Sequence, residues 1–340
     1  KNKSPEELTS LLIHDCFFII DYFKALNQDI LQFSPQVPEE LAQKVKLILK
    51  ISSYLQNYLK VHGFRTYNDQ LGDVIAFFKN NQNYIPEFEH LLVDEYQDIN
   101  RTQIELLNLL HPQNIFIVGD PRQSIFGWRG SESNEILSFE KKYPRGETIF
   151  LHKNYRSNKK IVDFMNLSIK ELNLPDLESI FPSKETLFLY NFPSEIDEMK
   201  FIREKIKNSK ETIFVLARTN KYLLELSTLL RQENIPHTIK KEDDFSEVRG
   251  ITLSTIHAIK GLEAEIVFVM GCNEQNFPCK YSEHPLSEVF KIEEYDKEKE
   301  EKRLFYVALS RAKHSLYLTY SGKQPTYFIS NDMKLLLTIV

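Results

Sequence analysis

The sequence predicts an α/β protein in which a helical segment precedes two units built on parallel sheets. From residue 88 onward, short apolar stretches such as HLLVDEY and NIFIVGD alternate with helical stretches such as RTQIELLNLLH. Strands that alternate with helices at this spacing indicate a parallel sheet with crossover helices. A second series of the same kind opens at ETIFLHKNYRS (147–157). A length of 340 residues has room for about two such units.

The helical segment and the two units give three predicted regions. Residues 1–65 show apolar residues at three-to-four spacing, and SPEEL offers a serine cap followed by acids, so this region is expected to be helical packing without chemistry. Residues 66–146 form the first α/β region and residues 147–340 the second. The charge-dense stretch 291–303 mixes signs, which predicts the exposed start of a helix.

Composition excludes several classes of protein. A hydrophobic fraction of 42% is too high for a disordered chain, and a net charge of −5 argues against binding nucleic acid over the whole surface, although a local basic groove stays open. Cys16, Cys272 and Cys279 match no zinc or disulfide spacing, so they are expected to be reduced thiols of a cytoplasmic protein. The apolar run LLIHDCFFII is broken by His14 and Asp15, so no membrane span or signal peptide is expected.

Two carboxylates close the first apolar strand of the α/β series. In LLVDEYQD a buried strand would carry Asp94 and Glu95 to its carboxyl end, where ligands gather in open α/β sheets. Asp94 can hold Mg²⁺ and Glu95 can take a proton from an attacking water, as phosphoryl transfer requires. A solvated acid pair at a strand end is an equally weighted explanation of this motif taken alone.

The next apolar strand ends in a polar loop with two aromatic residues. IFIVGDPRQSIFGWRG (115–130) carries Gln123, which could contact a terminal phosphate or order water. Phe126 and Trp128, the latter the only tryptophan, could stack on bases while Arg122 and Arg129 meet phosphates. The alternative for Trp128 is a packing residue between lobes.

Three further stretches follow in order, HKNYRS (152–157), STIHAIKGLEAEIVFVMG (254–271) and EEKRLFYVALSRAK (300–313). With the two preceding stretches, this series resembles motifs II, III, IV, V and VI of the UvrD/Rep family of superfamily-one DNA helicases. The resemblance covers about residues 66–320. It implies two RecA-like P-loop NTPase lobes that close on ATP, in a motor that moves 3′ to 5′ along single-stranded DNA and unwinds duplex DNA. It also implies Mg²⁺ as a cofactor, and repair or replication proteins as further partners.

The resemblance also implies roles for residues on the nucleotide side. Asp94 and Glu95 resemble the Mg²⁺ ligands, with Glu95 as catalytic base, and Gln123 resembles the sensor of the γ-phosphate. Arg156 and Arg311 resemble the arginines that neutralise the transition-state charge, a role that suits a guanidinium because it stays charged and forks onto phosphate oxygens. The remaining nucleotide-binding positions are Tyr155 on adenine, Glu263 on the ribose, and Gly261 beside it.

On the DNA side, the family uses the positions of Phe126, Trp128, Arg129, Thr255 and His257 for bases and backbone. Three of the charged residues keep alternatives. Arg129 could form a salt bridge between lobes, and His257 could be a satisfied core residue. Arg303 could face nucleotide or lie on a helix surface.

Two departures from the family limit what the resemblance implies. No G-x-x-x-x-G-K-[ST] phosphate loop is present, and the only glycines before residue 119 are Gly63 and Gly72. A sheet without its remaining strands would expose an apolar edge, which favours a fragment of a longer helicase that binds MgATP poorly by itself. Only EDDFSEVRG (242–250) stands where larger members insert a helical domain. The rival interpretation is a non-catalytic module that binds DNA or a protein.

Overall fold

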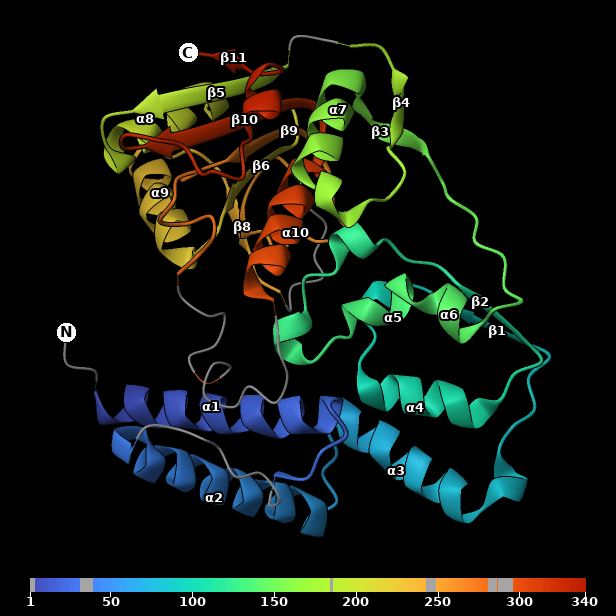
Figure 1. The fold of residues 1–340 in the computed structure, drawn as a ribbon. Helices are drawn as coiled ribbons and strands as arrows, with labels where there is room; N and C mark the ends of the chain where they lie inside the picture. Colours follow the sequence, from blue (N-terminus) through green and yellow to red (C-terminus); the bar gives the residue numbers. More distant parts are fainter. Residues whose placement is uncertain (1–3, 31–38, 184–185, 243–248, 281–285, 287–295) are drawn as a thin grey trace. The chain divides into compact units, whose positions relative to one another are not determined.

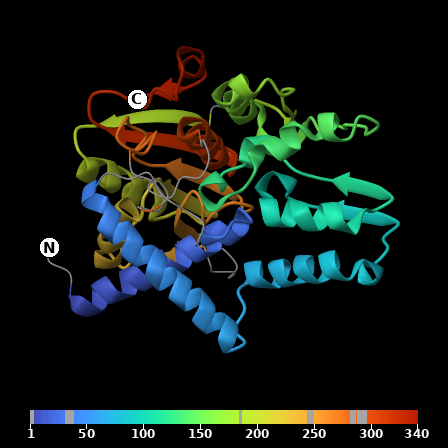
Figure 2. The same cartoon turned by 60° about the horizontal axis from the view of Figure 1, so that its bottom comes forward.

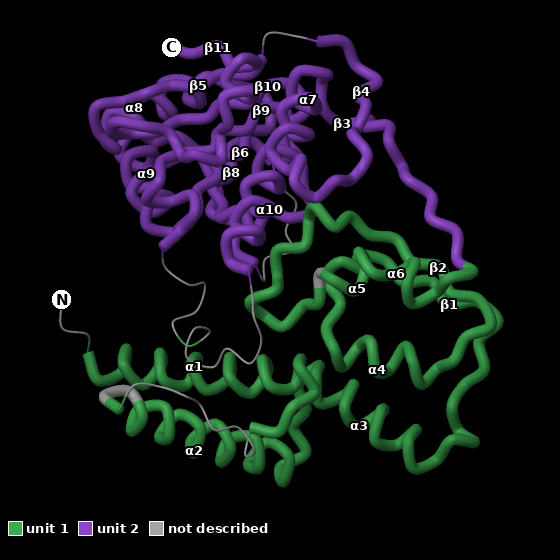
Figure 3. Tube along the Cα trace, viewed as in Figure 1, with its two compact units in different colours: residues 1–145, 281–295 green, residues 146–280, 296–340 purple. Residues whose placement is uncertain are grey.

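The computed structural model describes residues 4–30, 39–183, 186–242, 249–280, 286 and 296–340. The chain forms two compact units, residues 1–145 with 281–295 and residues 146–280 with 296–340, shown in Figure 3. From the sequence, residues 281–295 are expected in the second region. Of this segment the structure describes Leu286, which packs against a cluster of unit 1 that includes Ile19 and Phe23. Residues 291–295 of the charge-dense stretch and 243–248 of the short connection lie outside the described residues.

Unit 1 begins with two helices that pack against each other (Figure 1 and Figure 2), α1 (Pro5–Ala25) and α2 (Glu39–Val61). The predicted serine cap of α1 is confirmed, because the Ser4 hydroxyl accepts from the Glu7 amide and the Glu7 carboxylate accepts from the Ser4 amide. Cys16, Ile19 and Phe23 form the fully buried face of α1.

The rest of unit 1 carries the first predicted strand and helix series. It consists of α3 (Tyr67–Asn80), β1 (His90–Val93), α4 (Arg101–Leu110), β2 (Asn114–Ile117), α5 (Ser133–Leu137) and α6 (Phe139–Lys142). Strands β1 and β2 form a parallel pair in register from His90 with Asn114 to Val93 with Ile117. Parallel sheets are ordinarily covered on both faces, yet Leu92 is 72% exposed and Phe116 57% exposed.

Unit 2 contains a parallel sheet with the order β11-β5-β10-β9-β6-β8-β7 among the described residues. Its strands are β5 (Leu187–Phe192), β6 (Ile213–Ala217), β7 (Thr238–Lys240), β8 (Ile251–Thr255), β9 (Ala264–Val269), β10 (Ala312–Ser321) and β11 (Thr338–Ile339). Its helices are α7 (Lys159–Ser168), α8 (Glu195–Ile206), α9 (Asn220–Gln232), α10 (Lys297–Leu309) and α11 (Asn331–Lys334). The α/β class with parallel sheets is therefore confirmed.

The start of unit 2 differs from the prediction. The stretch 147–157 is expected to open as one strand, but β3 (Lys153–Asn158) begins only at Lys153 and pairs with β4 (Glu178–Phe181) in a separate two-stranded sheet. Ile149 is 70% exposed and Leu151 81% exposed. Among the described contacts, the ladder with β4 extends back to the His152 carbonyl, which accepts from the Glu178 amide at 2.8 Å.

The core of unit 2 packs against both faces of its sheet and so holds the strand ends in fixed positions. Ile213, Val215 and Ala217 of β6 face a cluster built with α8 and α9, while the alternate residue Phe214 points to the opposite face. Every residue of β6 is buried, as expected of a central strand covered on both sides. The carboxyl ends of such strands, where polar side chains gather, are therefore held by a packed core.

The prediction that residues 291–303 begin an exposed helix is confirmed at the start of α10, where Glu298 is 56% exposed, but it is wrong for the turn that follows. Glu300 and Glu301 are each 4% exposed and Arg303 is 7% exposed. Glu301 accepts hydrogen bonds from the Arg218 guanidinium, at 3.1 Å from Nε to each carboxylate oxygen, and from the Cys279 amide at 3.1 Å. The charge pattern of this stretch is typical of an exposed helix face, but Glu301 is buried because it pairs with Arg218 from another part of the chain.

The described residues include all three cysteines of the chain, and none of them is paired. Cys16, Cys272 and Cys279 are free thiols and all three are buried, which confirms that they form no disulfide framework. Burial raises the pKa of the Cys272 thiol well above its ordinary value, so it is protonated at neutral pH. The described helices include none with the length and apolar character needed to cross a bilayer.

One buried carboxyl group of unit 2 predicts a dependence of stability on pH. Glu198 of α8 is fully buried; its Oε1 accepts from the Thr319 hydroxyl at 2.6 Å and from the Gly271 amide at 2.7 Å, and its Oε2 has no hydrogen-bond partner. Desolvation by burial raises the pKa of Glu198 above 4.5, although these two hydrogen bonds lower it in part. The folded state therefore holds this proton more tightly than the unfolded state.

We expect Glu198→Gln to gain stability relative to the wild type as the pH rises. The contribution of protonated Glu198 is complete below pH 4.5 and is lost as the pH passes through the raised pKa, whereas glutamine does not titrate. The melting temperature of the variant minus that of the wild type should increase by roughly 2–4 °C or more between pH 5 and pH 8. Glu204→Gln on the exposed side of α8 is the control, because its pKa is lowered by the Lys207 hydrogen bond and it stays ionised throughout this range. A constant difference for Glu198→Gln would contradict the prediction.

Candidate nucleotide and DNA sites

The acidic pair lies directly after β1, in the turn that leads into a short 3-10 helix, Tyr96–Asp98. Asp94 and Glu95 are both exposed, and Glu95 adopts a left-handed backbone with φ of 50°. The Glu95 amide donates to Asp94 Oδ1 at 2.9 Å. This left-handed residue sharply reverses the chain after the strand, which is a conformation that costs free energy for a residue with a side chain.

Gln97 connects this turn to the second polar loop, and sequence reasoning missed it. It is 1% exposed, and its Nε2 donates to Glu95 Oε2 at 2.5 Å. Its Oε1 accepts from the Asp120 amide at 3.0 Å, and the Gln123 amide side chain donates to Asp120 Oδ2 at 3.0 Å. The candidate base and the candidate phosphate sensor are thus joined through Gln97 and Asp120. The sequence shows only a polar residue two positions after Glu95, and the burial of Gln97 appears only in the structure.

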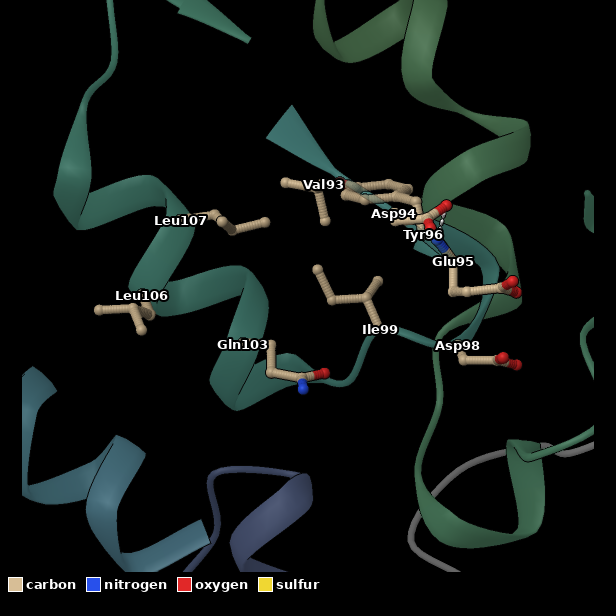
Figure 4. A pocket seen from close by; sticks show the side chains of 9 residues that line it. All are labelled: Val93, Asp94, Glu95, Tyr96, Asp98, Ile99, Gln103, Leu106 and Leu107. Carbon is tan, nitrogen blue, oxygen red and sulfur yellow. Dashed lines mark hydrogen bonds between the residues drawn. The ribbon is translucent and has the colours of Figure 1, made fainter. Parts of the chain in front are cut away.

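The carboxylates line a pocket of about 360 Å³ beside α4, shown in Figure 4. Asp94, Glu95 and Asp98 contribute to its lining together with apolar residues such as Leu106 and Leu107. Within the described ranges there is no cluster of three or more histidine, cysteine or carboxylate ligands for a metal. One or two carboxylates that leave the other positions to water and phosphate oxygens are how Mg²⁺ is commonly held in phosphoryl-transfer sites. The residues present therefore fit Mg²⁺ bound together with a nucleotide.

A larger groove of unit 1, of about 930 Å³, has aromatic walls. Its lining includes Phe126, Trp128 and Arg129 of the motif III loop and Phe18 and Tyr22 of α1. The Arg129 guanidinium lies 4.4 Å from the Trp128 ring centroid and 5.4 Å from that of Phe126. Cations over aromatic faces are stabilised by the ring quadrupole. The three predicted DNA-contacting residues of this loop therefore lie together.

In unit 2, Arg156 and Glu263 form an ion pair that the sequence does not reveal. Arg156 Nε donates to Glu263 Oε2 at 2.5 Å, and its NH1 donates to the Ser310 carbonyl at 2.9 Å. Lys313, which sequence reasoning missed, lies 2.8 Å from Glu263 Oε1. The hydrogen bond from Lys313, assisted by Arg156, lowers the pKa of Glu263. Both oxygens of Glu263 are thereby oriented by cations.

Arg311 is positioned by the packed end of α10. It is 1% exposed; its Nε donates to the Val307 carbonyl at 3.0 Å and its NH1 to the Leu262 carbonyl at 3.0 Å. Its NH2 donates to the Ser310 hydroxyl at 2.7 Å. Since Ser310 also accepts from Arg156 and Leu262 precedes Glu263, the structure brings Arg156, Glu263 and Arg311 to one place. Tyr155 directly precedes Arg156 in β3 and is 69% exposed.

The remaining predicted residues are Thr255 at the end of β8, His257 and Gly261 in the turn after it, and Arg303 of α10. The Thr255 hydroxyl accepts from the Ala258 amide at 3.4 Å, and His257 is 6% exposed, as the core alternative for this histidine expects. Gly261 has φ of +86°, with nothing within 4 Å of an added Cβ. Glycine therefore serves this turn through its backbone freedom. Arg303, 7% exposed, does not lie on a helix surface, contrary to that alternative.

Comparison with known protein families accounts for this order of motifs. Residues 9–144 match the model of the UvrD/REP helicase N-terminal domain, and residues 149–247 and 240–323 match that of the UvrD-like helicase C-terminal domain. The chain belongs to the UvrD/Rep helicase family. Both α/β units of this family member are covered by these matches.

Individual relatives of this UvrD/Rep member carry helicase names. It is 36% identical over 194 residues to the ATP-dependent DNA helicase PcrA of Staphylococcus aureus (strain Mu50 / ATCC 700699), covering 54% of the chain and 26% of that protein. It is 32% identical over 286 residues to the probable DNA helicase of Mycoplasma pneumoniae, covering 77% of the chain and 50% of that protein. The chain therefore spans half or less of the curated relatives. The C-terminal domain of a possible DNA helicase from Lactobacillus plantarum has a TM-score of 0.38 at 17% identity, covering 55% of the chain and 98% of that domain.

Proposed function

We propose that this chain is part of an ATP-dependent helicase that moves 3′ to 5′ along single-stranded DNA and unwinds duplex DNA. The observation that carries the proposal is the polar connection from Glu95 through Gln97 and Asp120 to Gln123. It joins a candidate base to a candidate phosphate sensor, so the two groups that would act at the attacking water and the γ-phosphate are held in one hydrogen-bonded network. Membership of the UvrD/Rep family supports ATP, Mg²⁺ and DNA as ligands.

Each site residue has a role in this proposal. Mg²⁺ bound with ATP would neutralise phosphate charge, and Asp94 and Glu95 are the residues that would hold it. Glu95 accepts the proton of the attacking water, while Gln123 senses the γ-phosphate. Arg156 and Arg311 neutralise developing charge, a contribution of about 10³ to 10⁵ in rate for arginine fingers. The nucleotide is further bound by Tyr155, Gly261 and Glu263, and DNA by Phe126, Trp128, Arg129, Thr255 and His257.

We further propose that the chain is a segment of a longer protein. It contains no G-x-x-x-x-G-K-[ST] stretch, whose backbone amides and lysine cradle the phosphates in P-loop NTPases. The exposed Leu92 and Phe116 of the β1 and β2 pair support a first lobe whose sheet continues in the native protein. Repair or replication proteins as partners and a cytoplasmic location complete the proposal.

ATP turnover stimulated by single-stranded DNA tests the proposal. We expect the 340-residue chain to turn over little ATP, because the missing phosphate loop removes ground-state and transition-state contacts together. The same chain extended upstream in its native reading frame to a phosphate loop should turn over ATP, and Glu95→Gln should abolish that activity. Glu89→Gln, a 76% exposed carboxylate just before β1, is the matched control and should leave it unchanged.

Two other outcomes would contradict parts of the proposal. Rapid turnover by the 340-residue chain, lost in Glu95→Gln, would show that the chain needs no upstream phosphate loop. An extended chain that binds DNA without any turnover would favour the second candidate, a non-catalytic binding module. The absence of a phosphate loop from this sequence is the observation that favours that candidate.

A further inference from the structure

The groove of unit 1 has a wall that no motif of the helicase family describes. Its motif III side carries Trp128 and Arg129, and the facing side is α1, where Phe18 and Tyr22 line the same groove. We propose that Phe18 and Tyr22 form a second stacking platform for the bases of single-stranded DNA, continuous with Trp128. This inference rests on the proposed DNA binding at the motif III loop and adds α1 to it.

The geometry of the rings supports a platform. Phe18 and Trp128 have centroids 6.1 Å apart with planes 17° from parallel, and Phe18 and Tyr22 have centroids 5.9 Å apart at 15°. Three nearly parallel rings therefore follow one another along the groove. Successive bases of a single strand stack on aromatic side chains, and every base offers a π-face, so a row of this kind binds without regard to sequence.

Phe18 and Tyr22 pack in part against the cluster of Ile19, Phe23, Ile30 and Val45, and the rest of each side chain lines the groove. The helix is held to its neighbours by the fully buried Cys16, Ile19 and Ile20. Phe18 and Tyr22 are one turn apart on an adjoining face and are only partly buried. Large aromatic side chains that remain accessible beside a groove of about 930 Å³ have room for a planar ligand.

The charges along the groove favour a polyanion with planar bases over an apolar peptide. Arg129 lies over the Trp128 ring, and Arg65, whose Nε donates to Asp73 Oδ2 at 2.7 Å, also lines the groove. The facing carboxylates are Asp21 and Asp98. Burial raises the pKa of the Asp21 carboxyl, and the nearby Lys24 counteracts this shift in part. Cations that meet phosphates beside rings that stack on bases are the combination found in single-strand binding grooves.

The test measures binding of a fluorescein-labelled 12-residue oligodeoxythymidylate to the full 340-residue chain by anisotropy. Quenching of Trp128 emission on the wild type provides a second signal. Phe18→Leu and Tyr22→Leu keep apolar bulk but remove the π-face, so each should weaken binding by roughly five- to a hundredfold. Tyr54→Leu is the matched control, because Tyr54 is a 67% exposed aromatic residue of α2 outside the groove, and it should bind as the wild type does.

A second measurement does not depend on the variants folding. An oligonucleotide with 5-bromodeoxyuridine at single positions should cross-link on illumination to the peptide that carries Phe18 and Tyr22. Three results would overturn this inference while leaving DNA binding intact. Both leucine variants could bind DNA with wild-type affinity, or the cross-links could be confined to other peptides. The third is that the chain self-associates and both variants abolish this self-association. A wild-type chain that binds no DNA would overturn the DNA-binding part of the proposed function as well.

Discussion

Replacing Glu301 by glutamine is expected to lower the free energy of unfolding of unit 2 by about 3–5 kcal/mol. Arg218 and Glu301 are each 4% exposed, and the guanidinium donates to both carboxylate oxygens. Removing one partner leaves the other charge buried without compensation, which costs far more than the net contribution of the pair. Urea unfolding followed by far-UV circular dichroism measures the loss.

The same helix supplies the control for this experiment. Glu298 is 56% exposed and lies 3.8 Å from Lys302, so Glu298→Gln should change the free energy of unfolding by less than about 0.5 kcal/mol. The double variant Arg218→Met with Glu301→Leu should recover much of the loss, because a buried ion pair can be replaced by apolar side chains at little cost. A loss below about 1 kcal/mol in Glu301→Gln would show that water reaches Arg218.

Replacing Gln97 by leucine is expected to lower the free energy of unfolding of unit 1 by about 1–3 kcal/mol. Leucine cannot donate to Glu95 or accept from the Asp120 amide, so both loops lose the partner that joins them. Gly119 makes the packing tight, since a Cβ there would lie 2.6 Å from Gln97 Oε1 and 3.2 Å from its backbone nitrogen. Trp128, in the same unit, reports the unfolding by its fluorescence.

A functional readout separates positioning from stability in this prediction. If Gln97 orients Glu95 and Gln123, Gln97→Leu should lower the kcat of the extended chain while leaving its KM for ATP nearly unchanged. Gln113→Leu, at an exposed residue before β2, is the matched control for both measurements. Unchanged kcat together with lowered stability would show that Gln97 only holds the two loops together.

Much of this fold follows from local patterns along the sequence. The alternation of apolar strands with helices predicts the parallel sheets, and the Ser4 cap predicts the start of α1. These predictions succeed because hydrophobic periodicity and capping act over a few neighbouring residues. The strand expected at 147–152 fails for the complementary reason: an apolar run becomes a strand only where another strand can pair with it.

Motif order alone indicated a UvrD/Rep helicase, because each motif places one type of chemistry at the end of one strand or helix. The sequence by itself therefore determined the α/β class, the family and the candidate residues from Asp94 to Arg311. Only the tertiary structure decided that Glu301 is buried against Arg218, that Gln97 joins Glu95 to Asp120, and that Phe18 lies beside Trp128. These contacts join residues that are distant in sequence or carried by different loops, and their burial depends on packing that no local pattern encodes.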